Sequence, residues 1–600
     1  MALKNMMQSR LRSSVALGAM ALGLSLAWPI SAGADYDQNH GRIKHVLLIS
    51  IDGMHALDYI NCVSGVPGAN GGKPYCPNLA ALKTQGVDYL DASTSKPSDS
   101  FPGLMAIVSG GSPRTVGAFY DVAYDRSLQP PANTTGNGVA AGTCKPGQTP
   151  TGTTTEYEEG IDINQAYLNG VGPTGGDGGI ASIDPTRLPR DPANNCQPVY
   201  PWNFVRTNTI FGVVHAAGGY TAWADKHPAY SSVSGPGDGT NVNDYYSPEI
   251  NSIAVPLPGV SANGVPCSPA LPDTSGNGSG WAYVDSFQNI QCYDQLKVNA
   301  ILNQINGKTH NGSRPAPTPN LFGMNFQAVS VGEKLIEKSL TPKVIGGYVD
   351  SIGTPSEALL GEIQFVDASI GKMVAALKST GRYDQTLIVI TAKHGQSPID
   401  SSRYTGITSA GPVTTSPATI LDGNNPDSAE CLPLSERPSN SPPGIGPTED
   451  DISQIWLNSS CTTAKAVSYL ESVSPATNNI AGIGQIFSGP GITQLFNAPG
   501  LPPHGDPRTP DIIVTPNVGV TYSGSSKKQA EHGGFAHDDT NVIMLLANPS
   551  LYPHTVTTPV QTMQVAPTIL RALGLDPNAL QSVAMEGTQT LPGVFSGWEH

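Results

Sequence analysis

Several polar side chains of this 600-residue sequence directly follow apolar runs, where they could do chemistry together. Asp52 ends the run HVLLISIDG (45–53), and Lys393 and His394 follow the run TLIVITA (386–392). A third polar segment, EHGGFAHDD (531–539), precedes the run NVIMLLAN (541–548). A carboxylate, an imidazole and an ammonium group in one place can hold an anion or a metal ion and move a proton. One strand-end aspartate alone is more often a loop cap, but several at one edge favour a site.

Ser100 lies where a helix is expected to begin. It precedes Phe101 and Pro102 in TSKPSDSFPGLMAIVSGG (94–111), and Pro102 fits the first helical turn. The unpaired N–H groups of a helix start stabilise an alkoxide and a bound anion. Ser100 is therefore a candidate nucleophile, and an ordinary serine N-cap is the alternative.

The elements that must position these residues alternate between strands and helices. The apolar runs at 45–53, 386–392, 511–517 and 541–548 are typical of strands buried on both faces. Apolar residues from Leu359 to Leu377 recur at steps of 3 and 4, which predicts one face of a helix. We expect an α/β fold with a mixed, mostly parallel sheet sandwiched by helices, and ligands at the carboxyl ends of the strands.

Two stretches, near 127–200 and 403–450, are rich in Thr, Ser, Gly and Pro and are predicted to be loop-rich insertions. The N-terminus combines basic residues, the short apolar run VALGAMALGLSLAWPI and the small residues Ala32 and Ala34. This pattern predicts a signal peptide, residues 1–34, cut after Ala34. The run is shorter than the ~20 residues that span a membrane, which argues against an uncleaved anchor. Residues 35–600 are predicted to form a single catalytic domain in the periplasm or outside the cell.

The net charge is −15, and removal of the basic leader would leave about −18. Binding to polymeric nucleic acid or to a membrane is not expected of such a chain, because it lacks clustered Lys and Arg. A small anionic substrate is compatible with this charge if a local cation attracts it. The even number of cysteines in an exported chain predicts disulfides between nearest neighbours in sequence. The eight cysteines are Cys62, Cys76, Cys144, Cys196, Cys267, Cys292, Cys431 and Cys461.

Taken together, these segments resemble the alkaline phosphatase superfamily, and most closely its type I phosphodiesterase and nucleotide pyrophosphatase branch. The resembling motifs occur in the family's order between residue 45 and about residue 575. They are LLISIDGM, KPSDSFPGLMAIVSGGSPRTVGAFYD, GGYVDSIGTPSEALLGEIQFVDASIGKMV, LIVITAKHGQSPID, EHGGFAHDDTNVIMLL and QVAPTILRALGL. The resemblance implies an alkaline-phosphatase-like fold and metal-dependent hydrolysis of phosphoric esters.

The resemblance also implies roles for single residues. Asp52 and His394 match ligands of a first divalent metal, and Ser100 matches the nucleophile, in place of the threonine common in this branch. Asp350 and His532 match ligands of a second metal. By ligand type the metal is expected to be Zn²⁺, as one or two ions.

Two positions depart from the family pattern: Thr354 replaces a histidine and Lys393 replaces an aspartate. Thr354 opens the sequence TPSE (354–357), which predicts an N-cap with a capping box. The second metal would then need another donor. The candidates are His537, Asp538, Asp539 and, more remotely, His227, which is also a candidate for binding substrate.

Lys393 admits three interpretations. It is the cation of the first site in place of a metal, it is neutral, or it points away. We adopt the first as a working hypothesis, because a fixed ammonium beside Ser100 could lower the pKa of the hydroxyl and hold a phosphoryl oxygen. Gly103 occupies the position where the family typically has an asparagine that donates to phosphate, and Lys393 could supply that donation.

The predicted function is hydrolysis of phosphoric (di)esters by an exported enzyme, through a covalent phosphoserine at Ser100. A sulfatase or phosphonate hydrolase of the same superfamily is one alternative. A secreted binding protein on a decayed hydrolase scaffold is another, because two ligand positions are altered. The sequence does not predict the oligomeric state.

Overall fold

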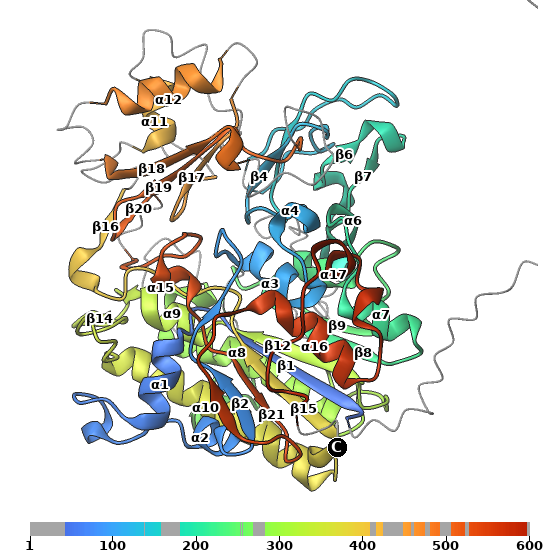
Figure 1. Cartoon of the computed structure of the whole chain (residues 1–600), viewed down its shortest axis with the longest axis vertical. Coiled ribbons are helices and arrows are strands. Elements are labelled where there is room, and N and C mark those ends of the chain that lie inside the picture. The colour runs from blue at the N-terminus through green and yellow to red at the C-terminus, as the bar shows by residue number, and fades with distance from the viewer. Residues whose placement is uncertain are drawn as a thin grey trace, which may run out of the picture.

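A sheet of eight strands forms the centre of the structure, a computed structural model (Figure 1). In order across the sheet, the strands are β22 (His554–Val556), β2 (Gly86–Tyr89), β21 (Leu545–Ala547), β15 (Thr386–Thr391), β1 (His45–Ile51), β12 (Leu321–Phe326), β8 (Thr221–Ala224) and β9 (Asp244–Tyr246). β21 is antiparallel to both of its neighbours, and the other described pairings in this sheet are parallel. The structure describes residues 43–136, 138–157, 180–251, 254, 256–267, 282–407, 416–423, 448–457, 461–473, 481–492, 506–522 and 527–596.

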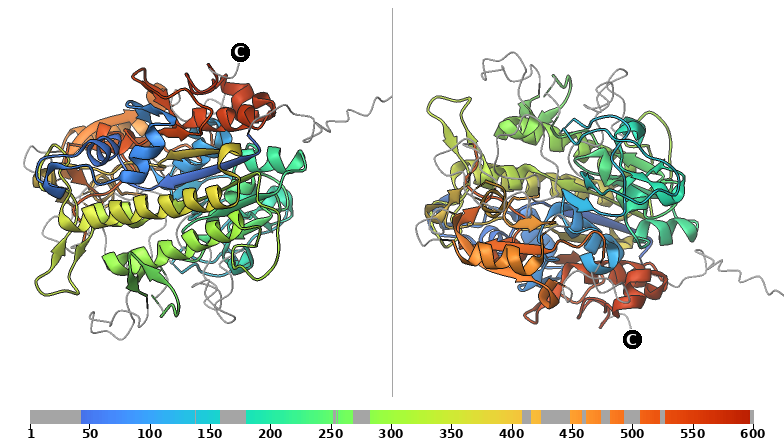
Figure 2. Two further views of the ribbon diagram at one scale, coloured as in Figure 1. Left: turned by 90° about the horizontal axis from the view of Figure 1, so that it is seen from below. Right: turned by 90° about the horizontal axis from the view of Figure 1, so that it is seen from above.

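The sheet is covered by helices on both faces because successive side chains of its strands point to opposite sides. Val46 and Leu48 of β1 belong to a core with α3 (Ser100–Ser109), α7 (Ile210–Ala216) and α16 (Val565–Ala572). The alternate residues of β1 belong to a second core on the other face. The helices of that core include α2 (Pro77–Lys83), α8 (Phe287–Ile305) and α10 (Glu357–Ser379), and Figure 2 shows α8 and α10 as light-green and yellow helices on this face. The predicted α/β sandwich is confirmed.

The predicted helix around 359–377 is α10, but its N-cap differs from the prediction. The side chain of Ser356 caps the helix by accepting a hydrogen bond from the N–H of Leu359. Thr354 lies two residues earlier, and Pro355 still pairs with Tyr348 in an isolated β-bridge. The helix therefore begins after Ser356 and not after Thr354, and the predicted capping box is wrong.

The run at 511–517 forms a strand, but not one of the central sheet. β19 (Ile512–Pro516) lies between β17 (Ser453–Ile455) and β18 (Ile483–Ser488) in a separate antiparallel sheet. With α11 (Pro417–Gly423) and α12 (Thr463–Glu471), this sheet encloses a small core of its own, at the upper left of Figure 1. A buried apolar run predicts a strand, but it does not reveal which of two sheets the strand joins.

Disulfides close three of the chain's irregular segments. The pairs Cys62–Cys76, Cys144–Cys196 and Cys267–Cys292 are the predicted nearest-neighbour pairs. Cys461 is also disulfide-bonded, and Cys431 lies outside the described residues, as does the predicted signal peptide. Within the described residues, none of the helices is both long enough and apolar enough to cross a membrane.

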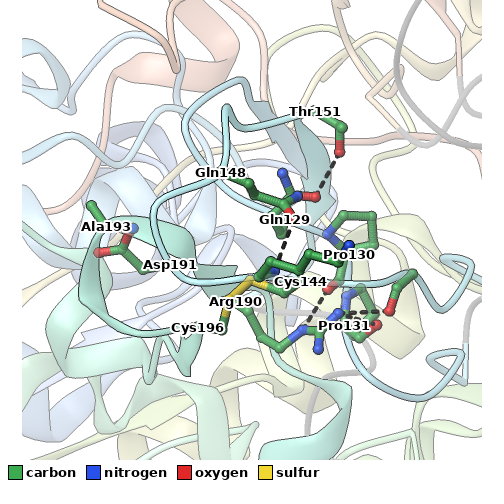
Figure 3. Close-up of a disulfide and its surroundings, with 12 residues drawn as sticks. Gln129, Pro130, Pro131, Cys144, Gln148, Thr151, Arg190, Asp191, Ala193 and Cys196 are labelled. Atoms are coloured by element: carbon green, nitrogen blue, oxygen red, sulfur yellow. Dashed lines mark hydrogen bonds between the residues drawn. A yellow bond between two sulfur atoms is a disulfide. The ribbon is translucent and has the colours of Figure 1, made fainter.

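The insertion near 127–200 shows how such a disulfide is supported (Figure 3). Beside Cys144–Cys196, Arg190 and Gln129 exchange two backbone hydrogen bonds. The guanidinium group of Arg190 donates to the carbonyl of Pro130 at 2.9 Å. The strands and helices in the described part of the insertion are thus short, as expected of a loop-rich segment, and a disulfide and several hydrogen bonds hold its segments together.

Candidate active site

The candidate site lies at the carboxyl ends of four neighbouring strands. Asp52 directly follows β1, and His394 comes three residues after β15. Asn325 lies in β12, with Gln327 just after it, and Lys226 comes two residues after β8. Because these strands are parallel, their carboxyl ends meet at one edge of the sheet, so residues far apart in sequence become neighbours.

Ser100 is the first residue of α3, as the sequence predicted, and two side chains contact its hydroxyl. The Oγ atom lies 3.0 Å from Nε2 of His394 and 2.8 Å from Nζ of Lys226, which donates to it. The other ring nitrogen of His394, Nδ1, lies 2.8 Å from the carbonyl oxygen of Gly395. A carbonyl only accepts hydrogen bonds, so in the neutral ring Nδ1 carries the proton and Nε2 is free to accept the proton of Ser100.

Asp52 supplies negative charge beneath this pair. Its Oδ2 atom accepts hydrogen bonds from Asn325 at 3.1 Å and from Gln327 at 2.6 Å. The same atom lies 3.5 Å from Nε2 of His394 and 3.7 Å from Nζ of Lys226. Burial would raise the pKa of Asp52, but its interactions with Lys393, His394 and Lys226 outweigh burial and hold it well below its ordinary value. Asp52 is therefore a permanent anion.

Lys393 does not contact Ser100. Its Nζ atom donates to Oδ1 of Asp225 at 2.9 Å and lies 3.9 Å from the ring centroid of Tyr230. The working hypothesis, that Lys393 is the cation at the nucleophile, does not match this geometry, because the lysine that reaches Ser100 is Lys226. Sequence reasoning missed Lys226, although the segment WADKHPAYS has the same pattern of a strand followed by Asp.

Gly103 has a steric reason to be glycine. A Cβ atom at this position would lie 2.9 Å from the carbonyl carbon of Lys393 and closer still to its oxygen. α3 therefore packs against the backbone at the end of β15, which places Ser100 beside His394. The N–H of Phe101, in the first turn of α3, already has a partner, because it donates to the side chain of Asp121 at 3.2 Å.

His532 lies next to the Ser100 pair. Its ring stacks on that of His394, with centroids 3.9 Å apart, and its Nδ1 atom lies 3.2 Å from Oδ1 of Asp99. Burial lowers the pKa of His532, and its neighbours His394, Lys334 and Lys226 lower it further. His532 and Lys226, 6% and 7% exposed, are the members of this group nearest to solvent, whereas Ser100 is fully buried.

The remaining predicted site residues lie elsewhere. Asp350 is exposed, and its carboxylate accepts hydrogen bonds from the N–H groups of Ile352 and Thr354 rather than approaching His532. His227 is buried and pairs with Glu249 at 2.8 Å. The other candidate donors all lie in α15 (His537–Thr540); they are His537, Asp538 and Asp539. His537 and Asp538 line a different cavity, beside His55 and Leu57.

The family model described as type I phosphodiesterase/nucleotide pyrophosphatase matches residues 46–203 and 347–538, together more than half of the chain. The chain belongs to this family. As a type I phosphodiesterase/nucleotide pyrophosphatase, it is a phosphodiesterase-like hydrolase with an alkaline-phosphatase-like fold, as the sequence predicted. No curated protein matches the sequence.

Solved structures of ectonucleotide pyrophosphatase/phosphodiesterase 5 resemble this phosphodiesterase at 13% sequence identity. The murine protein has a TM-score of 0.48, with 89% of this chain and 96% of the other covered. An inactive murine variant in complex with AMP has a TM-score of 0.49, with 93% and 99% covered. The human protein has a TM-score of 0.46, with 88% and 95% covered.

The resemblance to this family implies a divalent metal at Ser100 and Asp52, and the charges around these two residues decide whether one fits. An ion bound to Ser100 Oγ and Asp52 would lie within about 4 Å of the Lys226 ammonium, where repulsion costs about 8 kcal/mol at an effective dielectric of ~20. Oδ1 of Asp52 has no hydrogen-bond partner among the described residues, but one free oxygen does not make a metal site. The family's second ligand pair is also divided, because Asp350 lies apart from His532. The family's metal positions therefore do not fit a metal in this chain.

Two other groups of side chains in the described part of this phosphodiesterase could hold an ion. They are His55 with Asp58 and Glu333, and His532 with Asp450 and Glu531. Neither group includes Ser100. In the second group, Lys334 and Lys528 already neutralise Glu531, whose pKa burial would raise but the two lysines lower to about 2.

Proposed function

We propose that this chain is an exported hydrolase of small phosphoric esters in which Ser100 is the nucleophile and His394 is the general base. The observation that supports the proposal is the contact of 3.0 Å between Ser100 Oγ and His394 Nε2, with Nδ1 held by the carbonyl of Gly395. Family membership supports the reaction class. The AMP complex of the murine protein supports a small substrate that carries a phosphoryl group.

The reaction has two displacements at phosphorus. In the first, Ser100 Oγ forms a bond to phosphorus, the bond to the leaving oxygen breaks with its electron pair, and the serine proton moves to His394 Nε2. In the second, a water oxygen forms a bond to phosphorus and releases a proton to the solvent, and His394 returns its own proton to Oγ as the bond from phosphorus to Oγ breaks. The proposal routes no step through Zn²⁺ or another metal, because the residues around Ser100 do not fit one.

His532 and Asp52 have supporting roles in this proposal. Asp52 stabilises the imidazolium that forms when His394 takes the proton, from a distance of 3.5 Å. Burial and neighbouring groups lower the pKa of His532, so its ring stays neutral. The ring packs against His394 without competing for the proton. Asp350 and His227 have no role in the two displacements.

Hydrolysis of bis(4-nitrophenyl) phosphate by the purified chain tests the proposal, because the nitrophenolate leaves without needing a proton. Ser100→Ala is expected to lower kcat by roughly 10³-fold or more, the scale of losing a covalent nucleophile. Ser95→Ala, a serine in the same segment with no contact to Ser100, is the matched control and is expected to keep full activity. Wild-type protein without activity on phosphodiesters, phosphomonoesters, phosphonates and sulfates would contradict the proposal.

A fluorophosphonate probe separates this proposal from the alternative of a secreted binding protein. The displacement of Asp350 from His532 is the observation that favours that alternative. A covalent adduct on the Ser100 peptide, absent from Ser100→Ala, supports catalysis. Ligand binding without an adduct supports the binding protein, and faster hydrolysis of sulfate esters would indicate a sulfatase.

Export, with cleavage after Ala34 and one catalytic domain over residues 35–600, is part of the same proposal. The disulfide pairs of the structure support it, since disulfides form and persist in oxidising compartments. Intact-mass measurement before and after alkylation under nonreducing conditions tests it. A retained leader, or eight alkylated thiols in the unfolded chain, would contradict it.

A further inference from the structure

We infer that Lys226 is a catalytic residue whose ammonium takes the place of a divalent metal at Ser100, so that this site transfers phosphoryl groups with no metal bound to the nucleophile. The inference rests on the proposed function and goes beyond it by naming the group that holds the negative charge. Unlike a metal-dependent site, this site should keep full activity after metals are removed.

The position of Lys226 carries the inference. Its Nζ atom donates to Ser100 Oγ at 2.8 Å and lies 3.7 Å from Oδ2 of Asp52. A positive charge between the nucleophile oxygen and a strand-end carboxylate is what a first metal ion would supply in this family. Here the Lys226 side chain provides that positive charge, and its ammonium would repel a metal ion placed at the same point.

The backbone of Lys226 is held in place by its neighbours. Its N–H donates to Oδ1 of Asp225 at 2.8 Å, and the same oxygen accepts from Lys393 at 2.9 Å. The other carboxylate oxygen of Asp225 accepts from the indole N–H of Trp223 at 2.8 Å. Lys393 is therefore a positioning residue that acts through Asp225. This network is buried, so its charge-assisted hydrogen bonds are strong. They hold the backbone from which the Lys226 side chain extends towards Ser100.

Other groups near Ser100 cannot supply the stabilising charge. The N–H of Phe101 already donates to Asp121, and Gly103 has no side chain. Lys393 is bonded to Asp225 and does not reach the hydroxyl. Among the described residues, Lys226 is thus the lysine that contacts the nucleophile.

The chemistry requires such a charge twice. As the serine proton moves to His394, Oγ becomes negative and the ammonium stabilises it by a charge-assisted hydrogen bond. When the new bond to phosphorus forms and the bond to the leaving oxygen breaks, the same ammonium can donate to a nonbridging phosphoryl oxygen, since Lys carries three N–H donors. No oxidant, reductant or further co-reactant is needed besides water.

The first test removes metals from the full chain. Protein dialysed against EDTA, with its metal content measured, is expected to hydrolyse bis(4-nitrophenyl) phosphate within about 2-fold of the untreated rate, and added Zn²⁺ or Mn²⁺ should not increase it. A loss of more than 10-fold that either ion restores would overturn the inference. That outcome would leave the proposed Ser100 nucleophile standing. Failure of the proposed function differs, because no substrate would then be hydrolysed and no adduct would form on Ser100.

The second test removes the ammonium. Lys226→Ala is expected to lose roughly 10²- to 10³-fold in kcat, the scale of removing one transition-state donor. Lys372→Ala, a lysine on α10 far from the site, is the control and should keep full activity. Ethylammonium should restore part of the activity of Lys226→Ala and none to Ser100→Ala. Unchanged activity of Lys226→Ala, or rescue by Zn²⁺ but not by the amine, would overturn the inference. If Lys226→Ala melts at a lower temperature, Lys226→Arg keeps the test decisive, since it retains the charge and should keep more activity than Lys226→Met.

Discussion

Lys393 and Asp225 form a fully buried ion pair, with Nζ of the lysine 2.9 Å from Oδ1 of the aspartate. The ring of Tyr230 covers the ammonium from one side. The pair joins the end of β15 to the end of β8, and Lys226 follows Asp225 directly. The pair therefore both stabilises the fold and holds Asp225, whose carboxylate also binds the backbone N–H of Lys226, the lysine that contacts Ser100.

Lys393→Ala should destabilise the protein by roughly 3–5 kcal/mol, because it leaves Asp225 as an uncompensated buried charge. The double variant Lys393→Met/Asp225→Asn removes both charges and should recover much of that loss. Urea denaturation of Lys393→Met, Asp225→Asn and the double variant measures the coupling. Wild-type stability of Lys393→Ala would show that the ion pair contributes nothing to the fold.

Gly103→Ala should lower both activity and stability, because the new Cβ would collide with the backbone of Lys393. Overpacking of this kind costs typically ~1–3 kcal/mol, and a shift of α3 would also separate Ser100 from His394. Gly361→Ala is the control: it lies within α10 with open space around its Cβ position, so it should stabilise the helix by roughly 0.5–1 kcal/mol. Equal melting temperatures for the two variants would contradict the packing described at Gly103.

Asp451→Asn should make stability less dependent on pH. Asp451 and Asp539 are buried side by side; burial and mutual repulsion raise the pKa of Asp451 well above its ordinary value, and burial raises that of Asp539 to about 6. The folded state thus keeps protons that the unfolded state releases, so stability is fully present at low pH and falls as pH rises from about 4 through 6.

The variant has one acid fewer to ionise, so at pH 8 it should be more stable than wild type by roughly 1–3 kcal/mol. The advantage should shrink towards pH 4. Asp384→Asn, an exposed aspartate, is the control and should follow the wild-type curve. Urea unfolding at several pH values makes the comparison, and a constant difference between wild type and Asp451→Asn would contradict the assignment.

Asp350→Ala should leave activity within about 2-fold of wild type and lower stability by less than ~1 kcal/mol, because the exposed carboxylate only accepts two backbone hydrogen bonds. Asp52→Asn is the contrasting variant, since it removes the buried anion between His394 and Lys226 and should lower kcat strongly. Initial rates on the aryl diester measure both. A loss of 100-fold in Asp350→Ala would mean that this residue takes part in the reaction.

Much of the fold and part of the site could be predicted from the sequence. Apolar runs that end in polar residues predicted β1 and β15, and parallel strands bring their carboxyl ends together whatever the sequence between them. That rule is why Asp52 and His394 were predicted as neighbours, whereas Ser100 was added to them from its expected helix start and from the resemblance to the family. The same rule, applied to the segment after β8, would have predicted Lys226.

The rest depended on interactions that a linear pattern does not contain. The direction of the Lys393 side chain is set by Asp225, which lies 168 positions away in sequence. Asp350 matched a family motif, but the turn that carries it faces solvent. The strand at 512–516 was recognised from its apolar run, whereas its place in a second sheet depends on partners that come from distant segments.

Trapping the intermediate tests the central claim, nucleophilic catalysis by Ser100, most directly. Wild-type protein mixed with bis(4-nitrophenyl) phosphate and quenched in acid within the first turnovers should yield a peptide around Ser100 with the mass of the added 4-nitrophenyl phosphoryl group. The same quench of Ser100→Ala should yield none. Steady hydrolysis by wild type without any adduct on Ser100, or equal hydrolysis by Ser100→Ala, would contradict the account.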